Sequence, residues 1–141
     1  MALSANPYIV GLKEASGNID QIVRLAQMLE GKIALYSGED ALDFLYLALG
    51  AKGMISVTAN AFPKRKVALY TAMKKSDFNK ARQLHNEMLE INNTLFCEVN
   101  PIPVKAMLHH LGICSDEMRA PLTTIEDASR RKLVDAYKKL G

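Results

Sequence analysis

Short apolar runs alternate with amphipathic stretches over the first 62 residues, and this alternation constrains the fold more than any other feature of the sequence. The apolar runs occupy residues 8–13, 33–37 and 54–57. Apolar positions recur at helical spacing through residues 19–29, and a shorter helix is expected at residues 40–49. Buried strands that are joined by returning helices form parallel βαβ units with right-handed crossovers. The sequence therefore predicts an α/β fold with three parallel strands.

The spacing of these strands suits a TIM-type (β/α) barrel. From Lys13 to Ser37 is 24 residues, and from Ser37 to Val57 is 20. Eight such units need about 180 residues, so a chain of 141 residues cannot form the complete barrel. After the third strand the sequence predicts helices alone, near residues 63–74, 77–95, 103–111 and 125–140. We expect one structural unit, with a partial β/α barrel at 1–62 followed by the last barrel helix and a C-terminal helical region at 63–141.

Composition and charge exclude several classes of protein. The chain has 18 Lys+Arg and 15 Asp+Glu, and a net charge of +3 is too small for a strong phosphate-binding field. Every apolar run is shorter than the roughly 18 residues of a membrane span, and the N-terminus lacks the regions of a secretion signal. Cys97 and Cys114 match neither a disulfide framework nor a zinc pattern. We expect a cytoplasmic protein without a nucleic-acid or membrane partner and without a metal.

Lys13 is the first candidate for chemistry, because it closes the first expected strand. In parallel α/β folds the carboxyl ends of the strands form the functional face. A lysine that is partly desolvated there favours its neutral amine and can attack a ketone to form a Schiff base. The alternative is that Lys13 simply reaches into solvent, as lysines at strand ends usually do.

Several separated motifs resemble the dihydrodipicolinate synthase (4-hydroxy-tetrahydrodipicolinate synthase) family. VGLKEASG at residues 10–17 resembles its Schiff-base lysine motif, and SGED at 37–40 its next strand end. GMISVTAN at 53–60 resembles the eighth strand and the loop after it, and FCEVNPIPVK at 96–105 resembles a segment among its C-terminal helices. RAPL at 119–122 completes the set. The resemblance covers nearly the whole chain and the C-terminal half of the family's barrel.

The resemblance implies an activity and roles for three residues. Lys13 would form the imine with pyruvate, which the family condenses with aspartate semialdehyde in lysine and diaminopimelate biosynthesis, without a cofactor. The main-chain carbonyl of Ile55 would face the pyruvate pocket. Gly38 would lie at the pocket wall, where a side chain would obstruct the substrate. Without the resemblance, Ile55 could be a core residue and Gly38 a turn residue.

The half of the family's barrel that is missing from this sequence carries much of its machinery. It supplies a threonine pair that holds the pyruvate carboxylate, two tyrosines that relay protons and an arginine at the entrance. Tyr36 is the one tyrosine near the carboxyl end of a strand, and packing in the core or on the barrel exterior is its expected role. We therefore expect little or no activity from the chain alone.

Three functional hypotheses remain open. The chain could be a fragment or split subunit that becomes a lyase with an N-terminal half, a non-catalytic interaction or regulatory module, or another pyruvate-type class I aldolase of the same superfamily. An open half-barrel leaves sheet edges and apolar faces to cover. We therefore expect a homo-oligomer or a partner that supplies the missing half.

Other charged and polar residues have simpler interpretations. Glu39 and Asp40 could be an acid/base pair, but capping of the following helix is the favoured interpretation. The basic triplets at 64–66 and 130–132 are expected on solvated helix faces. Adjacent helix positions point about 100° apart, so a metal shared by His109 and His110 is not expected.

Overall fold

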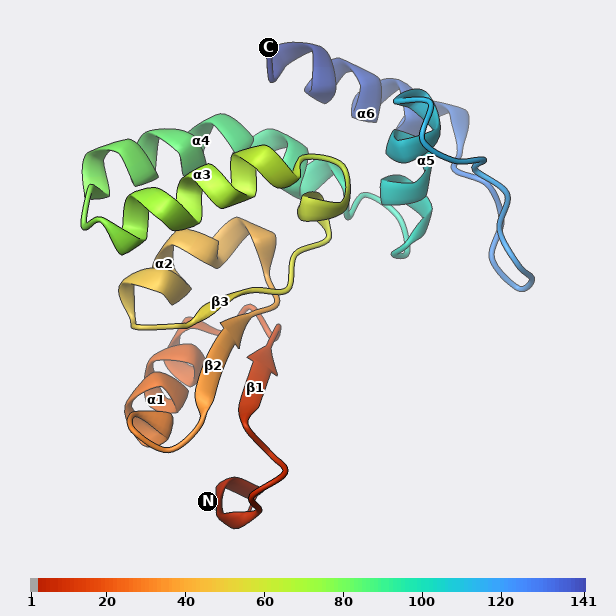
Figure 1. Ribbon diagram of the computed structural model, residues 1–141. Coiled ribbons are helices and arrows are strands. Elements are labelled where there is room, and N and C mark those ends of the chain that lie inside the picture. The colour runs from red at the N-terminus through yellow and green to blue at the C-terminus, as the bar shows by residue number, and fades with distance from the viewer. Residues whose placement is uncertain (1–2) are drawn as a thin grey trace.

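Three short parallel strands form the only sheet in the part of the chain that the structure describes, residues 3–141 of a computed structural model (Figure 1). The strands are β1 (Gly11–Glu14), β2 (Ala34–Ser37) and β3 (Gly53–Met54), in the order β1-β2-β3. The predicted sheet of three parallel strands is confirmed. With β2 in the centre, both outer strands have one edge unpaired among the described residues.

The helices between the strands follow local signals in the sequence. Helix α1 (Ile19–Leu29) begins after Asn18, whose side chain accepts a hydrogen bond from the Gln21 amide at 3.1 Å. A 3₁₀ turn, η2 (Asp40–Leu42), leads into α2 (Asp43–Ala48). Both helices pack against β2, so they cover one face of the sheet.

Two strands are shorter than the sequence predicts, and the pairing register is the reason. β1 begins at Gly11, and Tyr8 is 91% exposed and Val10 76% exposed. Pairing extends only from Gly11 opposite Ala34 to Glu14 opposite Ser37. β3 likewise pairs only where β2 still lies beside it, so the expected strand at 54–57 is reduced to Gly53–Met54.

After β3 the described chain forms helices joined by turns and loops, as predicted. Its elements are α3 (Pro63–Lys74), α4 (Phe78–Thr94), α5 (Ile102–His110) and α6 (Asp127–Lys139), with 3₁₀ turns η1 (Leu3–Ala5) and η3 (Thr58–Asn60) elsewhere. In Figure 1, α3 and α4 lie side by side beyond α2, and α5 and α6 lie at the end of the molecule opposite the N-terminus. None of the helices in residues 3–141 is long and apolar enough to cross a membrane.

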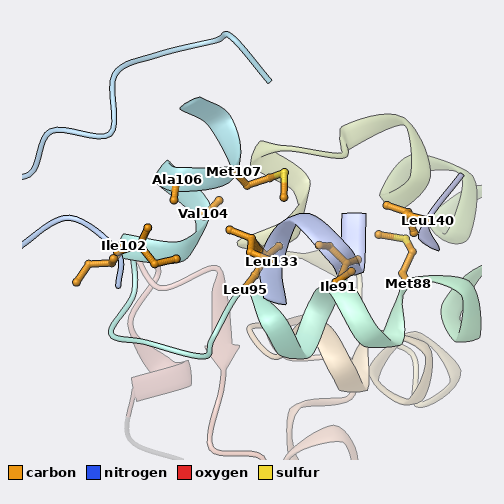
Figure 2. Close-up of a cluster of buried hydrophobic side chains, with 11 residues drawn as sticks. Met88, Ile91, Leu95, Ile102, Val104, Ala106, Met107, Leu133 and Leu140 are labelled. Atoms are coloured by element: carbon orange, nitrogen blue, oxygen red, sulfur yellow. The ribbon is translucent and has the colours of Figure 1, made fainter. Parts of the chain in front are cut away.

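The largest apolar core lies in the helical region and not at the sheet. Figure 2 shows its side chains converging from α4, α5 and α6. The members are Met88, Ile91, Leu95, Ile102, Val104, Ala106, Met107, Ile125, Leu133, Ala136 and Leu140. The cluster at the sheet is smaller, with Ile22, Leu35, Tyr46 and Ala51. Burial of apolar surface therefore stabilises the helical end more than the strands.

The two faces of the sheet differ in what covers them. Leu35 is buried against α1 and α2, and because side chains alternate along a strand, its neighbour Tyr36 points to the other face. Lys13 pairs in register with Tyr36 and therefore shares that face. Helices α1 and α2 contact β2 on the Leu35 side, and Figure 1 shows no ribbon beside the unpaired edge of β1. We call the side with Leu35 the covered face and the side with Lys13 the open face.

Candidate active site

Lys13 and Gly38 meet at the carboxyl end of the sheet, on adjacent strand ends. A Cβ atom added at Gly38 would lie 2.6 Å from Lys13 Cε, 2.8 Å from Ala15 Cβ and 2.9 Å from the Glu14 carbonyl oxygen. All three distances are shorter than a real Cβ contact, so the glycine is needed here for space. Two of the three residues predicted for the site are thus in contact.

The side chain of Lys13 is exposed in this chain, so its expected partial desolvation is not observed. The physical reason is the open face, since α1 and α2 pack against β2 on the other face of the sheet. The ammonium group can therefore reach solvent or a partner from the position that it occupies beside Gly38.

Ile55 follows the third strand and lies near the same end of the sheet. Its amide donates a hydrogen bond to the Ser37 carbonyl at 2.7 Å, which ties the loop after β3 to the end of β2. The Ile55 side chain is 51% exposed, so the alternative that it is a core residue is wrong. The direction of its carbonyl toward a pyruvate pocket remains a prediction.

Glu14 fixes the backbone directly after Lys13 from the covered face. Its side chain is 5% exposed, and it accepts hydrogen bonds from the Tyr46 hydroxyl, from Gln21 Nε2 at 2.8 Å and from the Ser16 amide at 3.1 Å. Burial alone would raise the pKa of Glu14, but these hydrogen bonds outweigh it and hold the pKa below its usual value. Tyr46 also donates to the Glu14 carbonyl at 3.1 Å. The end of β1 is therefore anchored to α1 and α2.

A buried ion cluster lies next to this site. Lys66 Nζ is 2.7 Å from Asp40 Oδ1 and 2.7 Å from Asp43 Oδ2, and each of the three side chains is 3% exposed or less. We call these three residues the Lys66 cluster. The prediction that residues 64–66 form a solvated face is wrong for Lys66, because successive residues on α3 point about 100° apart and the third one faces inward. Lys64 is exposed, as predicted.

Arg65 also departs from the solvated face that was predicted. Its guanidinium donates to the carbonyl oxygens of Leu140 at 2.5 Å and Gly141 at 2.9 Å, which ties α3 to the C-terminal end of the described chain. In the second basic triplet, Arg130 pairs with Asp116 at 2.7 Å while its two neighbours are exposed.

The two aspartates of the Lys66 cluster differ in their proton affinity. Burial alone would raise the pKa of Asp40, but Lys66, Ser56 and the Thr58 amide stabilise its charge and hold the pKa below the usual value. Burial raises the pKa of Asp43 to about 6, although Lys66 and Ser37 act in the opposite direction. The capping interpretation is wrong for Asp40, because its carboxylate is buried and accepts from Ser56 and Thr58 on another element. Glu39 makes no side-chain cap either.

Tyr36 packs on the open face, not on the barrel exterior. A Cβ atom at Gly11 would lie 2.8 Å from its Cε2, and one at Gly53 would lie 3.5 Å from its Cδ1 and Cε1. The ring therefore lies between two glycines of the neighbouring strands. Packing was the expected role, and the face is the part that the sequence did not predict.

The three histidines have separate environments. His109 Nδ1 is 3.1 Å from the Cys114 carbonyl oxygen, whereas His110 packs edge-on against Tyr137 with ring centroids 5.6 Å apart. Burial and the nearby Lys66 lower the pKa of His85, and its buried Nδ1 has no hydrogen-bond partner among the described residues. Across residues 3–141, no group of three or more His, Cys, Asp or Glu side chains could hold a metal ion.

Comparison with known proteins settles the family. The Dihydrodipicolinate synthetase family matches residues 1–140. The chain belongs to this family. The resemblance that the separated motifs indicate is therefore confirmed. The family is a family of lyases.

Curated relatives and solved structures agree with this assignment. The 4-hydroxy-tetrahydrodipicolinate synthase of Thermodesulfovibrio yellowstonii is 40% identical over 139 residues, which are 99% of this chain and 48% of that protein. A crystal structure of chloride-inhibited dihydrodipicolinate synthase from Acinetobacter baumannii, complexed with pyruvate, matches with a TM-score of 0.95 and 40% identity over 99% of this chain and 48% of that chain. The Thermotoga maritima enzyme matches with a TM-score of 0.94 and 33% identity over 99% and 49% of the two chains. The chain spans about half the length of the relatives that it matches.

Sequence reasoning missed the Lys66 cluster, although a signal was present. Asp40, Asp43 and Tyr46 follow one another at intervals of three, so they share one helix face. If that face is buried, two carboxylates on it require a cation. The sequence did not indicate which lysine supplies the charge.

Proposed function

We propose that this chain is the C-terminal part of a dihydrodipicolinate synthase barrel and that Lys13 is its Schiff-base lysine. The observation that carries the proposal is the contact between Lys13 and Gly38 at the carboxyl end of a parallel sheet, where a Cβ at Gly38 would lie 2.6 Å from Lys13 Cε. The open face and the two unpaired strand edges support a partial barrel. The match to a pyruvate-complexed enzyme supports pyruvate as the ligand.

The chemistry of the proposal begins with the Lys13 amine. Its nitrogen attacks the pyruvate ketone, and loss of water gives a protonated imine. This imine accepts electrons from the C–H bond of the pyruvate methyl group, so the methyl carbon loses a proton and becomes an enamine. The enamine carbon then attacks the aldehyde carbon of aspartate semialdehyde, whose oxygen takes up a proton and becomes a hydroxyl, while the nitrogen returns to the protonated imine. Attack on the imine carbon by water or by the amine of the product then releases the product and frees Lys13.

The complementary half of the barrel is required for turnover in this proposal. In the described chain the side chain of Lys13 is exposed, and the hydroxyl of Tyr46 is committed to Glu14. A positioned acid or base contributes about 10² to 10⁴ in rate. We therefore assign the proton relay and the grip on the carboxylate to the complementary half of the barrel.

Borohydride trapping tests the role of Lys13. The chain is incubated with pyruvate and borohydride, alone and with the N-terminal half of a full-length relative, and peptide mass spectrometry locates the adduct. An adduct at Lys13 is expected, and Lys13→Ala should remove it. Lys52→Ala is the matched control, because Lys52 is an exposed lysine directly before β3, at the amino end of that strand. Trapping that is equal at Lys52 and Lys13 would contradict the proposal.

A non-catalytic interaction module is the second candidate, and the open face favours it. Tyr8, Val10 and Ile55 are exposed apolar side chains at or near β1 and β3. A homologue that binds here would be retained equally by wild type and Lys13→Ala, and no adduct would form. A different aldolase of the superfamily would trap pyruvate but prefer another aldehyde.

Cys97 and Cys114 are free and exposed, which supports a reducing cytoplasm as the location.

A further inference from the structure

The Lys66 cluster contains the most deeply buried charges near the proposed pocket, and the reaction described above does not use them. Its three members come from three different elements, with Asp40 in η2, Asp43 at the start of α2 and Lys66 in α3. Charges are costly to bury unless they are paired and hydrogen-bonded. The hydrogen-bond partners of the two carboxylates show which loops the cluster holds in place.

The Asp43 carboxylate is hydrogen-bonded to the loop that carries Gly38. Ser37, the last residue of β2, donates from its hydroxyl to Asp43 Oδ1 at 2.6 Å. The Ser37 hydroxyl also accepts the Glu39 amide at 3.3 Å, so the residues on both sides of Gly38 are held. The Gly38 amide in turn donates to the Glu14 carbonyl at 2.7 Å.

The Asp40 carboxylate is hydrogen-bonded to the loop that carries Ile55. Ser56 donates from its hydroxyl to Asp40, and the Thr58 amide donates to Asp40 Oδ2 at 3.0 Å. The Ser56 hydroxyl also accepts the Ala59 amide at 2.8 Å. From α4, Asn92 Nδ2 donates to the Asp40 carbonyl at 3.0 Å. The residue after Ile55 is therefore fixed to the same cluster as the residue before Gly38.

The ammonium group of Lys66 is what permits both connections at once. Two carboxylates that approach one site repel each other, and in a buried site one of them would take up a proton or move away. Lys66 Nζ lies 2.7 Å from an oxygen of each and so offsets that repulsion. Its position fixes the separation of Asp40 and Asp43, and through them the separation of the two loops.

We propose that Lys66 is a positioning residue for the lysine pocket, because its ammonium fixes the loops of Gly38 and Ile55 relative to each other and to Lys13. The inference deepens the proposed function and rests on the assignment of Lys13. A misplacement of about 1 Å in a reacting geometry can cost on the order of 100-fold in rate. We therefore expect the loss of Lys66 to slow imine formation on the order of 10- to 100-fold.

Hydrogen exchange measures the effect on the loops. Lys66→Met keeps the length of the side chain and removes the charge, and Lys64→Met on the exposed face of the same helix is the matched control. The amides of Gly38 and Ile55 should exchange faster in Lys66→Met. The amides of Ala34 and Lys52, which bond the same strand pairs at their other ends, should not change. Equal acceleration at both ends would indicate a general loss of stability and would overturn the inference.

A comparison of two reactions of Lys13 measures the effect on the pocket. Acetic anhydride labels the exposed amine without a pocket, whereas pyruvate trapping requires one. Lys66→Met should lower the ratio of pyruvate trapping to acetylation at Lys13, and Lys64→Met should leave it unchanged. An unchanged ratio in Lys66→Met contradicts a positioning role. If wild type traps no pyruvate, alone or with the complementary half, the proposed function fails, and the exchange pattern alone then decides whether Lys66 positions the loops.

Two neutral substitutions keep the inference testable if Lys66→Met does not fold. Ser37→Ala removes the connection to Asp43 and should accelerate exchange at Gly38 more than at Ile55. Ser56→Ala removes the connection to Asp40 and should have the opposite preference. Identical exchange profiles in the two variants would overturn the inference.

Discussion

The two faces of the sheet make different contributions. On the covered face, Leu35 is packed between helices, and Glu14 and Ser37 are held by Tyr46 and by Asp43. On the open face, Lys13 is exposed and the Tyr36 ring covers two glycines. The covered face provides stability and fixes the strand ends, and the open face presents the reactive amine. Substitutions on the two faces should therefore separate stability from chemistry.

The largest effect is expected for Leu35→Ala on the covered face. Leu35 is 5% exposed and packs with Ile22, Tyr46 and Ala51. Truncation of a buried leucine costs about 2 to 5 kcal/mol because it leaves a cavity. The free energy of unfolding, measured by urea denaturation, should fall by about that amount. A fall below about 0.5 kcal/mol would mean that this face is not packed as described.

The second prediction concerns pH. Burial raises the pKa of Asp43 to about 6, so the folded protein binds this proton more tightly than the unfolded chain, whose aspartate has the usual value of 3.8. The contribution of Asp43 to stability is therefore present below about pH 4 and is lost as the pH rises through about 6, by about 2 to 3 kcal/mol.

Asp43→Asn should remove this contribution. Its free energy of unfolding should fall less than that of wild type between about pH 4 and 7, when both are measured by urea denaturation across that range. Parallel pH dependences for the two proteins would show that Asp43 does not carry the raised pKa.

A smaller effect is expected for Tyr46→Phe, which removes one hydroxyl and little volume. The hydroxyl donates to the buried carboxylate and to the carbonyl of Glu14. Loss of a donor to a buried group costs about 1 to 3 kcal/mol. The pKa of Glu14 should also rise toward its usual value, which NMR titration of its carboxyl carbon would detect. No change in that pKa would contradict the anchoring of the end of β1.

The smallest effect on stability is expected for Lys13→Ala on the open face. Lys13 is exposed, and surface substitutions usually change the free energy of unfolding by less than about 0.5 kcal/mol. The pyruvate adduct should nevertheless disappear completely. A large loss of stability in Lys13→Ala would contradict the assignment of stability to the covered face and of chemistry to the open face.

The contact between Lys13 and Gly38 could be expected from the sequence, because carboxyl ends of parallel strands meet at one edge of a sheet. The extents of β1 and β3 could not, because pairing with β2 decides them and the apolar runs at 8–10 and 55–57 lie outside the residues that pair in register with β2. The burial of Lys66 could not be predicted either, since a basic triplet on a helix does not reveal which of its members faces two carboxylates from other elements.

Turnover with and without the complementary half tests the central claim most directly. The chain is assayed with pyruvate and aspartate semialdehyde, alone and after addition of the N-terminal half of a full-length relative, with Lys13→Ala in parallel. We predict that the chain alone is slower than the mixture by about 10² or more, because positioned acid/base groups are missing, and that Lys13→Ala is inactive in both. Equal rates with and without the added half, or activity in Lys13→Ala, would contradict the account.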